Sequence, residues 1–170
     1  MKTKNLKIAL ETLRDTIIEE ARSNLINAGK GGGELENSLQ GTKVTKTKGG
    51  FGFDILMEDY GEFVDKGVSG VEKKYNTPYS YRDKMPPPSK LDKWIVKKSI
   101  APRDEKGRFL KRKTVQFLIA RSIFKNGIAP SLFYTNAYKK AVNTFSDKLE
   151  DSVKKDVQDF IKMMKKNIKK

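Results

Sequence analysis

The residues that come nearest to a catalytic pattern are acidic and basic side chains between positions 59 and 74. Metal-dependent nucleases place an acid and then Glu-x-Lys on adjacent strands, and here Glu72-Lys73-Lys74 follows Asp59 and Asp65. The segment around Glu72 has no strand pattern, so it lacks the rigid support that a metal site requires. Glu-x-Lys also arises by chance in a lysine-rich chain, and we interpret this match as incidental.

The composition removes most other catalytic chemistry. The 170 residues include no histidine and no cysteine, and 36 basic against 21 acidic side chains give a formal charge of +15. Without imidazole or thiol, there is no Ser/His/Asp or Cys/His nucleophile and no thiolate or imidazole ligand for zinc. We therefore expect a binding or assembly protein, not an enzyme, with no cofactor and no metal.

No segment of the sequence is suited to export or to membrane insertion. Glu11, Arg14 and Asp15 interrupt the region after the basic N-terminus, so no apolar signal core exists. The longest apolar run, Phe117 to Ala120, cannot span a bilayer. We expect a soluble protein without a membrane partner.

Apolar residues at helical spacing predict one helix near each end of the chain. The first stripe ends at Gly29 and consists of Leu6, Leu10, Leu13, Ile17, Ala21 and Leu25. The second helix is predicted to be unusually long, with Ser131 as its N-cap. Its stripe consists of Tyr138, Val142, Phe145, Leu149, Val153, Val157, Phe160 and Met164, and Lys162, Lys165, Lys166, Lys169 and Lys170 gather at its end.

Between these helices, residues 42–57 have the pattern of a β-hairpin. β-Branched residues at 42–47 precede Gly49-Gly50, which we interpret as the turn, and apolar residues then alternate. The alternating set is Phe51, Phe53, Ile55 and Met57. Because this face needs a cover, we predict an α+β fold in which the two terminal helices pack on a small antiparallel sheet.

The region from 71 to 127 is predicted to be a basic insertion with two short helices and extended arms. Residues 68–88 have little periodicity and read as an exposed arm, with Pro86-Pro87-Pro88 at its end. Ser89 with Asp92 is predicted to cap a helix that carries Trp94, which we assign to the core. A turn-centred basic hook, residues 103–113, leads to a second helix with Thr114 as its cap and Gly127 as its end.

The positive charge is concentrated in this insertion. Residues 71–125 contain 16 basic and 5 acidic side chains, whereas residues 1–70 contain 10 and 11. We divide the chain into a core helix and hairpin at 1–70, the insertion at 71–127 and the long helix at 128–170, within a single domain overall. Such a surplus predicts a docking surface for an acidic partner or a contact with nucleic acid. The alternative is a charged face that serves only solubility.

A sequence-independent DNA-binding protein is one interpretation of the insertion. Lys90, Lys93, Lys97 and Lys98 could contact phosphates, but no evident set of Asn, Gln and Arg is available for base edges. The connector between the two helices is also too long for a helix-turn-helix.

Two short motifs favour another interpretation. The segment Tyr60-Gly61-Glu62-Phe63-Val64-Asp65-Lys66-Gly67 resembles the aromatic, apolar, Val, acid, Gly segment of the phage tail-completion and head-tail joining family. Pro130-Ser131-Leu132-Phe133-Tyr134, with Ala137, resembles the entry to that family's last helix. The phrases Pro-Pro-Pro-Ser-Lys-Leu-Asp-Lys-Trp and Ile-Ala-Pro-Arg-Asp-Glu-Lys-Gly-Arg-Phe in the insertion look like the version found in crAss-like podoviruses.

The resemblance implies a structural virion protein, made in the bacterial host cytoplasm, in a neck or tail ring that joins the portal and capsid to the tail. The implied partners are other copies in a ring, twelvefold in preference to sixfold, the adjacent portal, neck and tail ring proteins, and the genomic DNA in the channel. Our candidates for subunit interfaces are Tyr60, Phe63, Val64, Tyr75, Tyr79 and Tyr81. Our candidates for contact with an acidic partner or DNA are Arg103, Lys106, Arg108, Lys111, Arg112 and Lys113.

Overall fold

A computed structural model describes residues 3–168 and divides the chain into two compact units. The first unit contains residues 1–61 and 131–170, and the second contains residues 62–130. Residues 62–70, which we had grouped with the first part of the chain, thus fall in the second unit. Lys169 and Lys170 of the predicted basic tail lie outside the described residues.

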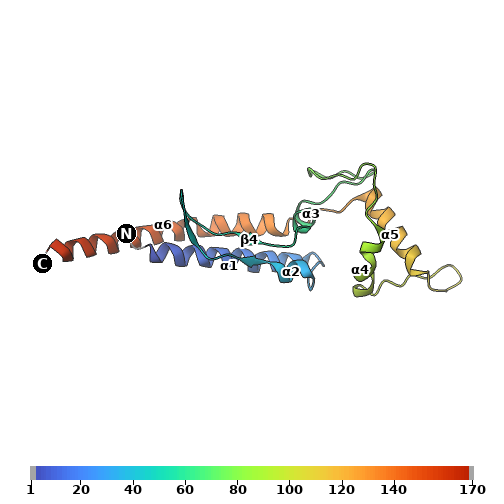
Figure 1. Ribbon diagram of the computed structural model, residues 1–170, viewed down its shortest axis with the longest axis horizontal. Helices are drawn as coiled ribbons and strands as arrows, with labels where there is room; N and C mark the ends of the chain where they lie inside the picture. Colours follow the sequence, from blue (N-terminus) through green and yellow to red (C-terminus); the bar gives the residue numbers. More distant parts are fainter. Residues whose placement is uncertain (1–2, 169–170) are drawn as a thin grey trace. The chain divides into compact units, whose positions relative to one another are not determined.

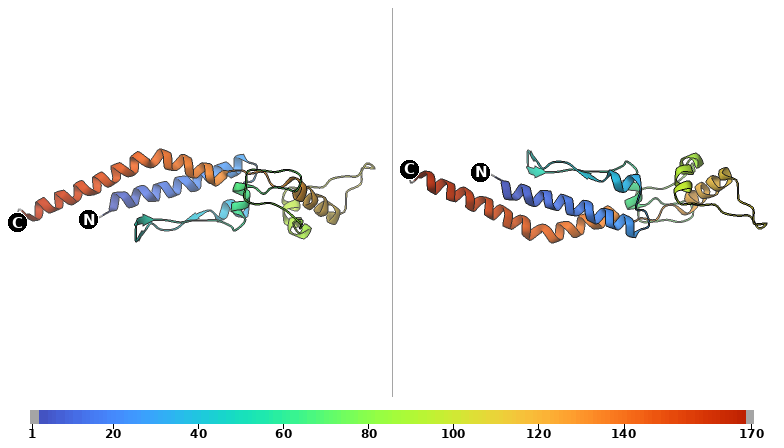
Figure 2. Two further views of the ribbon diagram at one scale, coloured as in Figure 1. Left: turned by 90° about the horizontal axis from the view of Figure 1, so that it is seen from above. Right: turned by 90° about the horizontal axis from the view of Figure 1, so that it is seen from below.

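The first unit has the predicted α+β architecture. Helices α1 (Lys4–Asn27) and α6 (Phe133–Ile168) lie side by side, and the strand segment runs along α1 (Figures 1 and 2). A short helix α2 (Glu34–Ser38) connects α1 to the strands. The strands are β1 (Gln40–Gly41), β2 (Thr45–Thr47), β3 (Gly50–Gly52) and β4 (Ile55–Leu56).

The predicted hairpin is present with a one-residue shift at its turn. β2 pairs antiparallel with β3 around Lys48-Gly49, so Gly50 is the first residue of the returning strand and not part of the turn. β1 pairs with β4 in a register that differs by one residue from the β2–β3 register. The linking segment 42–44 therefore contains one more residue than the linking segment 53–54, as in a β-bulge.

The core of the first unit lies between the helix pair and the strand segment. Leu13 and Ile17 of α1 pack with Ala141 and Phe145 of α6. Phe53, Ile55, Tyr134 and Leu149 are partly buried against this cluster. The α1 stripe is confirmed, since its central residues are buried, but the α6 stripe is only partly right. Tyr138, Val153, Val157 and Met164 are exposed, whereas α6 buries Phe133 and two alanines at its start that the predicted stripe left out.

The N-terminus of α1 is capped by a side chain from the other end of the sequence. The carboxylate of Asp156 in α6 accepts hydrogen bonds from the backbone N–H groups of Asn5 and Leu6, both at 3.0 Å, and from Asn5 Nδ2 at 2.9 Å. These are first-turn donors that have no partner within the helix itself. Beyond Asp156, α6 continues past the start of α1 (Figure 2).

The second unit consists of short helices and hydrogen-bonded loops. It includes most of α3 (Gly61–Lys66), η1 (Pro88–Leu91), α4 (Asp92–Lys97) and α5 (Arg112–Asn126). Gly127, with φ of 71°, ends α5 as predicted. The backbone of Val68 pairs with that of Ile128, with N···O distances of 2.8 and 2.9 Å. Gly70 and Gly127 lie in this seam, where a Cβ on either residue would overlap backbone atoms of the opposite segment.

Both predicted caps in the second unit are wrong. The α5 helix begins at Arg112, before Thr114, and neither α4 nor α5 has a side-chain cap hydrogen bond. Asp92 instead accepts a hydrogen bond from Gln116 Nε2 at 2.7 Å, so its carboxylate joins α4 to α5. In the first unit, α6 begins at Phe133, two residues after the predicted cap Ser131, and Leu132 before it has φ of 51°.

Candidate functional site

The basic hook is a small hairpin in the second unit. Arg103 and Phe109 form an antiparallel bridge, and the backbone N–H of Leu110 donates to the carbonyl of Pro102 at 3.0 Å. Gly107 occupies the turn with φ of 77°, a conformation that glycine adopts without strain. The predicted turn at the centre of the hook is therefore confirmed.

One carboxylate organises this turn. Asp104 Oδ1 accepts the backbone N–H groups of Lys106 and Arg108, both at 2.9 Å. Asp104 Oδ2 also accepts from the Arg108 guanidinium at 3.0 Å. An aspartate that bonds to backbone donors two and four residues onward fixes a turn without help from the rest of the fold.

The six predicted contact residues of the hook differ in how much of their charge is available. Arg108 pairs with Asp104, Arg112 pairs with Asp92 at 3.5 Å, and the Arg103 guanidinium lies 3.8 Å from the centre of the Phe109 ring. In the part of the chain that the structure describes, no ion pair is recorded for Lys106, Lys111 or Lys113. These three ammonium groups are the strongest candidates for contact with an anionic partner.

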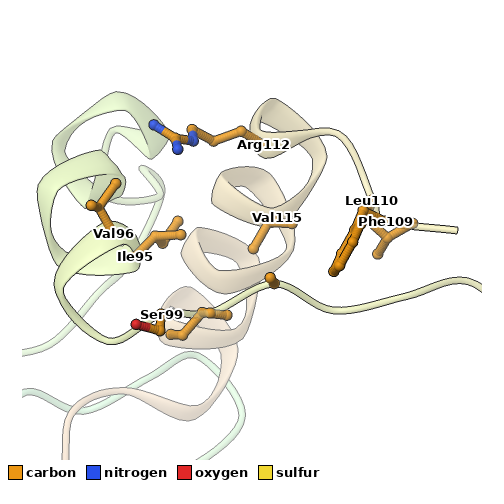
Figure 3. Close-up of a pocket in the computed structure, with 9 residues that line it drawn as sticks. Ile95, Val96, Ser99, Phe109, Leu110, Arg112 and Val115 are labelled. Carbon is orange, nitrogen blue, oxygen red and sulfur yellow. The ribbon is translucent and has the colours of Figure 1, made fainter.

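An apolar groove lies beside the hook, between α4 and the start of α5 (Figure 3). Its volume is about 380 Å³. Its lining is formed by Ile95, Val96, Ser99, Ile100, Ala101, Phe109, Leu110, Arg112 and Val115. Ile95 and Val115 are its buried floor, whereas Val96 and Phe109 are exposed. The sequence analysis missed this groove, although the apolar residues on both sides of the hook were a signal for it.

Trp94 does not belong to the core. Its side chain is 45% exposed, because Ile95, and not Trp94, is the residue of α4 that faces α5. The α4 helix is six residues long and can bury only one narrow face. Phe117 and Leu118 of α5 are also exposed, so the second unit carries several apolar side chains on its surface.

The tyrosine-rich segment is less exposed than predicted. Tyr75, Tyr79 and Tyr81 are half-buried, because residues 75–81 fold back on Ser69. The backbone N–H of Ser69 donates to Tyr79 O, and Ser69 O accepts from the backbone of Tyr81, both at 2.8 Å. The Ser69 hydroxyl also bonds to the backbone of Tyr75. This part of the segment is therefore anchored within its own unit and is not a free arm.

Phe63 and Tyr79 are brought together, as two of the predicted interface residues. Their ring centres are 4.6 Å apart in an edge-to-face arrangement. A hydrogen bond from the Tyr79 hydroxyl to Glu62 raises the pKa of Tyr79, and Glu62 also pairs with Lys66 at 2.6 Å. Tyr81 lies near Phe124, and Tyr75 lies beneath the ammonium group of Lys73.

Tyr60 and Val64 are the remaining predicted interface residues. Val64 is half-buried in α3. Tyr60 is exposed in the first unit, where burial of its hydroxyl and the nearby carboxylates of Glu34 and Glu58 raise its pKa. Tyr60 therefore lies in an acidic environment, in contrast to the basic surroundings of the hook.

The nuclease-like residues do not form a metal-binding cluster. Glu72 pairs with Lys125 of α5, and Asp65 is buried. Among the residues that the structure describes, no group of three or more acidic side chains could hold a metal ion.

The distal half of α6 carries an apolar stripe on its surface. Val153, Val157, Ile161, Met163 and Met164 are exposed, and Phe160 is partly buried.

No helix within residues 3–168 has the length and apolar character that crossing a bilayer requires. Comparison of the chain with protein-family models, with curated proteins and with solved structures finds no match.

Proposed function

We propose that the chain is a structural protein of a tailed-phage virion, a subunit of the neck or tail ring that joins the portal and capsid to the tail. In this proposal it is made in the bacterial host cytoplasm, catalyses no reaction and contributes to the conduit for genomic DNA. Its partners are other copies of itself, twelvefold in preference to sixfold, and the adjacent ring proteins.

The exposed apolar stripe of α6 is the observation that supports assembly most strongly. It continues past the start of α1, where the first unit offers no cover for it. Contiguous apolar surface of this kind marks a site of interaction with another molecule. The groove in the second unit gives the chain another such surface, as a subunit between neighbours requires.

The two motifs that carry the family resemblance come together in the structure, which also supports the proposal. Gly67 closes the first motif with φ of 75°, and Pro130 opens the second. A Cβ on Gly67 would lie 2.6 Å from the Pro130 nitrogen and 2.7 Å from the Ile128 carbonyl oxygen. Only glycine fits at this contact without overlap, which explains physically why the first motif ends in Gly67.

Mass spectrometry of purified particles tests the proposal. We expect the chain in a fixed number of copies per particle, and we expect electron micrographs of those particles to show a ring at the neck or tail. Absence of the chain from particles would contradict the proposal. So would cleavage of a phosphodiester or a small molecule by the purified protein.

A second candidate function, sequence-independent DNA binding, is favoured by the 16 basic and 5 acidic residues of segment 71–125. It predicts that affinity for duplex DNA falls steeply with salt. The variant Lys106→Glu/Lys111→Glu/Lys113→Glu should then abolish binding. A ring subunit whose hook docks on protein predicts weak DNA binding and little difference between this variant and the wild type.

A further inference from the structure

The strand segment of the first unit presents two chemically different faces. Phe53, Ile55 and Met57 are half-buried toward the helices, whereas Asp54, Leu56 and Glu58 are exposed on the opposite face. Alternation of this kind follows from the two-residue period of an extended chain. Leu56 is 55% exposed between two carboxylates.

This outward face continues into an acidic surface. Asp59 and Tyr60 follow it directly, and Glu34 of α2 is close enough to Tyr60 to raise its pKa. No ion pair is recorded for Asp54, Glu58, Asp59 or Glu34 in the described part of the chain. We call Asp54, Leu56, Glu58, Asp59 and Tyr60 the acidic strand face.

The groove of the second unit is complementary to this face in both charge and polarity. Its floor is aliphatic, and its rim carries Lys111, for which no ion pair is recorded in the described part of the chain and which follows the lining residue Leu110. Arg112, whose guanidinium also pairs with Asp92 at 3.5 Å, and Arg103 on the Phe109 ring add positive charge there. Val96 is 54% exposed, so its apolar side chain is available for contact with another molecule. The groove therefore suits a segment in which a leucine or tyrosine is flanked by carboxylates.

We propose that the groove of one copy binds the acidic strand face of a second copy, with Leu56 and Tyr60 against the aliphatic floor and Glu58 and Asp59 toward the cations of the rim. The inference rests on the proposed function and identifies one contact of the ring. The two surfaces differ, so a bound pair leaves one groove on one copy and one strand face on the other open, and the contact is head-to-tail. Such a contact generates a closed ring or an open filament.

The aliphatic lining favours protein over nucleic acid as the occupant. Ile95, Val96, Ile100 and Val115 offer nothing to a phosphate backbone, and DNA contacts are dominated by phosphate and sugar. A protein segment of mixed carboxylate and apolar character uses both the floor and the rim. The chain contains such a segment.

Disulfide trapping tests this contact in the full-length protein, because the chain contains no cysteine of its own. One copy carries Val96→Cys and the other carries Leu56→Cys, both at exposed positions where a substitution should change stability little. The matched controls pair Leu118→Cys with Leu56→Cys, and Val96→Cys with Ile8→Cys, at positions of similar exposure. Samples are mixed, oxidised mildly and followed by mass.

We expect the Val96→Cys and Leu56→Cys copies to form a covalent heterodimer about tenfold faster than either control pair, through the high effective concentration of bound groups. Adding Glu58→Lys and Asp59→Lys to the Leu56→Cys copy should slow trapping by about the same factor, since the like charges would then repel.

Equal rates for all pairs would overturn the proposal. Val96→Cys copies that cross-link with one another as fast as with Leu56→Cys would indicate a symmetric contact, which also overturns it. Protection of Val96→Cys from maleimide by duplex DNA, but not by the Leu56→Cys protein, would assign the groove to nucleic acid. The proposed function is tested separately by the content of particles, so the chain can prove to be a virion component while this contact is wrong.

Discussion

The two units of this protein obtain their structure in different ways. The first unit buries regularly spaced side chains between two long helices, with Leu25, Leu39, Phe133 and Ala137 at 0% exposure. The second unit has few buried apolar side chains and relies on backbone segments that approach closely, with Gly70 and Gly127 in the seam. The stability of the first unit therefore depends mainly on the volume of its buried side chains. The stability of the second unit depends mainly on how closely its backbone segments can approach.

The largest effect is expected in the first unit, from Phe133→Ala. Removal of a fully buried aromatic ring leaves a cavity and should lower the free energy of unfolding by roughly 3–5 kcal/mol. Denaturant unfolding followed by circular dichroism, which reports mainly on α1 and α6, measures this loss. Tyr138→Ala on the exposed face of the same helix is the control, and an equal loss there would contradict side-chain packing as the cause.

Gly127→Ala should produce the next largest effect, in the second unit. The new Cβ would overlap the Val68 carbonyl oxygen, and φ of 71° adds backbone strain, so we expect a cost of roughly 2–3 kcal/mol. Trp94 is the single tryptophan and lies in this unit, so its fluorescence follows the unfolding.

Gly107→Ala measures the cost of the positive φ alone, without the steric overlap that a Cβ on Gly127 would cause. Gly107 has a similar φ of 77°, but its Cβ would meet nothing within 4 Å. We expect it to cost roughly 1 kcal/mol, from backbone conformation alone. Equal losses of unfolding free energy at both glycines would show that close backbone approach in the seam does not add to the cost of Gly127→Ala.

Asp156→Asn should have a smaller effect, confined to the first unit. Desolvation of the buried Asp156 raises its pKa, but hydrogen bonds from Leu6 and Asn5 more than offset this and hold the pKa below the ordinary 3.8. The ionised carboxylate therefore stabilises the fold at pH values above about 4. This contribution is lost as the pH falls through the lowered pKa.

At neutral pH, Asp156→Asn should lower the free energy of unfolding by roughly 1–2 kcal/mol, because an amide accepts fewer hydrogen bonds from Asn5 and Leu6. As the pH falls from about 4 through the lowered pKa of Asp156, the variant and the wild type should converge in thermal stability. A difference that stays constant from pH 7 down to the acid-induced unfolding of the wild type would exclude the carboxylate cap as its source.

The smallest effect is expected from Trp94→Ala, within about 0.5 kcal/mol, because an exposed side chain loses little packing. Urea unfolding of this variant, followed by circular dichroism, gives the value. A cost above about 2 kcal/mol would mean that Trp94 packs in solution as a core residue.

The elements of the first unit could be predicted from the sequence because their apolar residues repeat at the period of the structure. The stripe from Leu13 to Leu25 and the alternation from Phe51 to Met57 each fix which face is buried. The caps of the second unit could not be predicted in the same way. Asp92 bonds across to Gln116 and not to its own helix, which depends on how α4 meets α5.

The sequence by itself determined the α+β architecture, the two long helices, the hairpin and the concentration of positive charge, because periodicity and composition act locally along the chain. The tertiary structure decided that Asp156 caps α1 from 151 residues away, that Trp94 is exposed, and that Ile95, Phe109 and Val115 form one groove. Each of these features depends on which segments contact one another in the folded protein, and the spacing of residues along the chain does not determine those contacts.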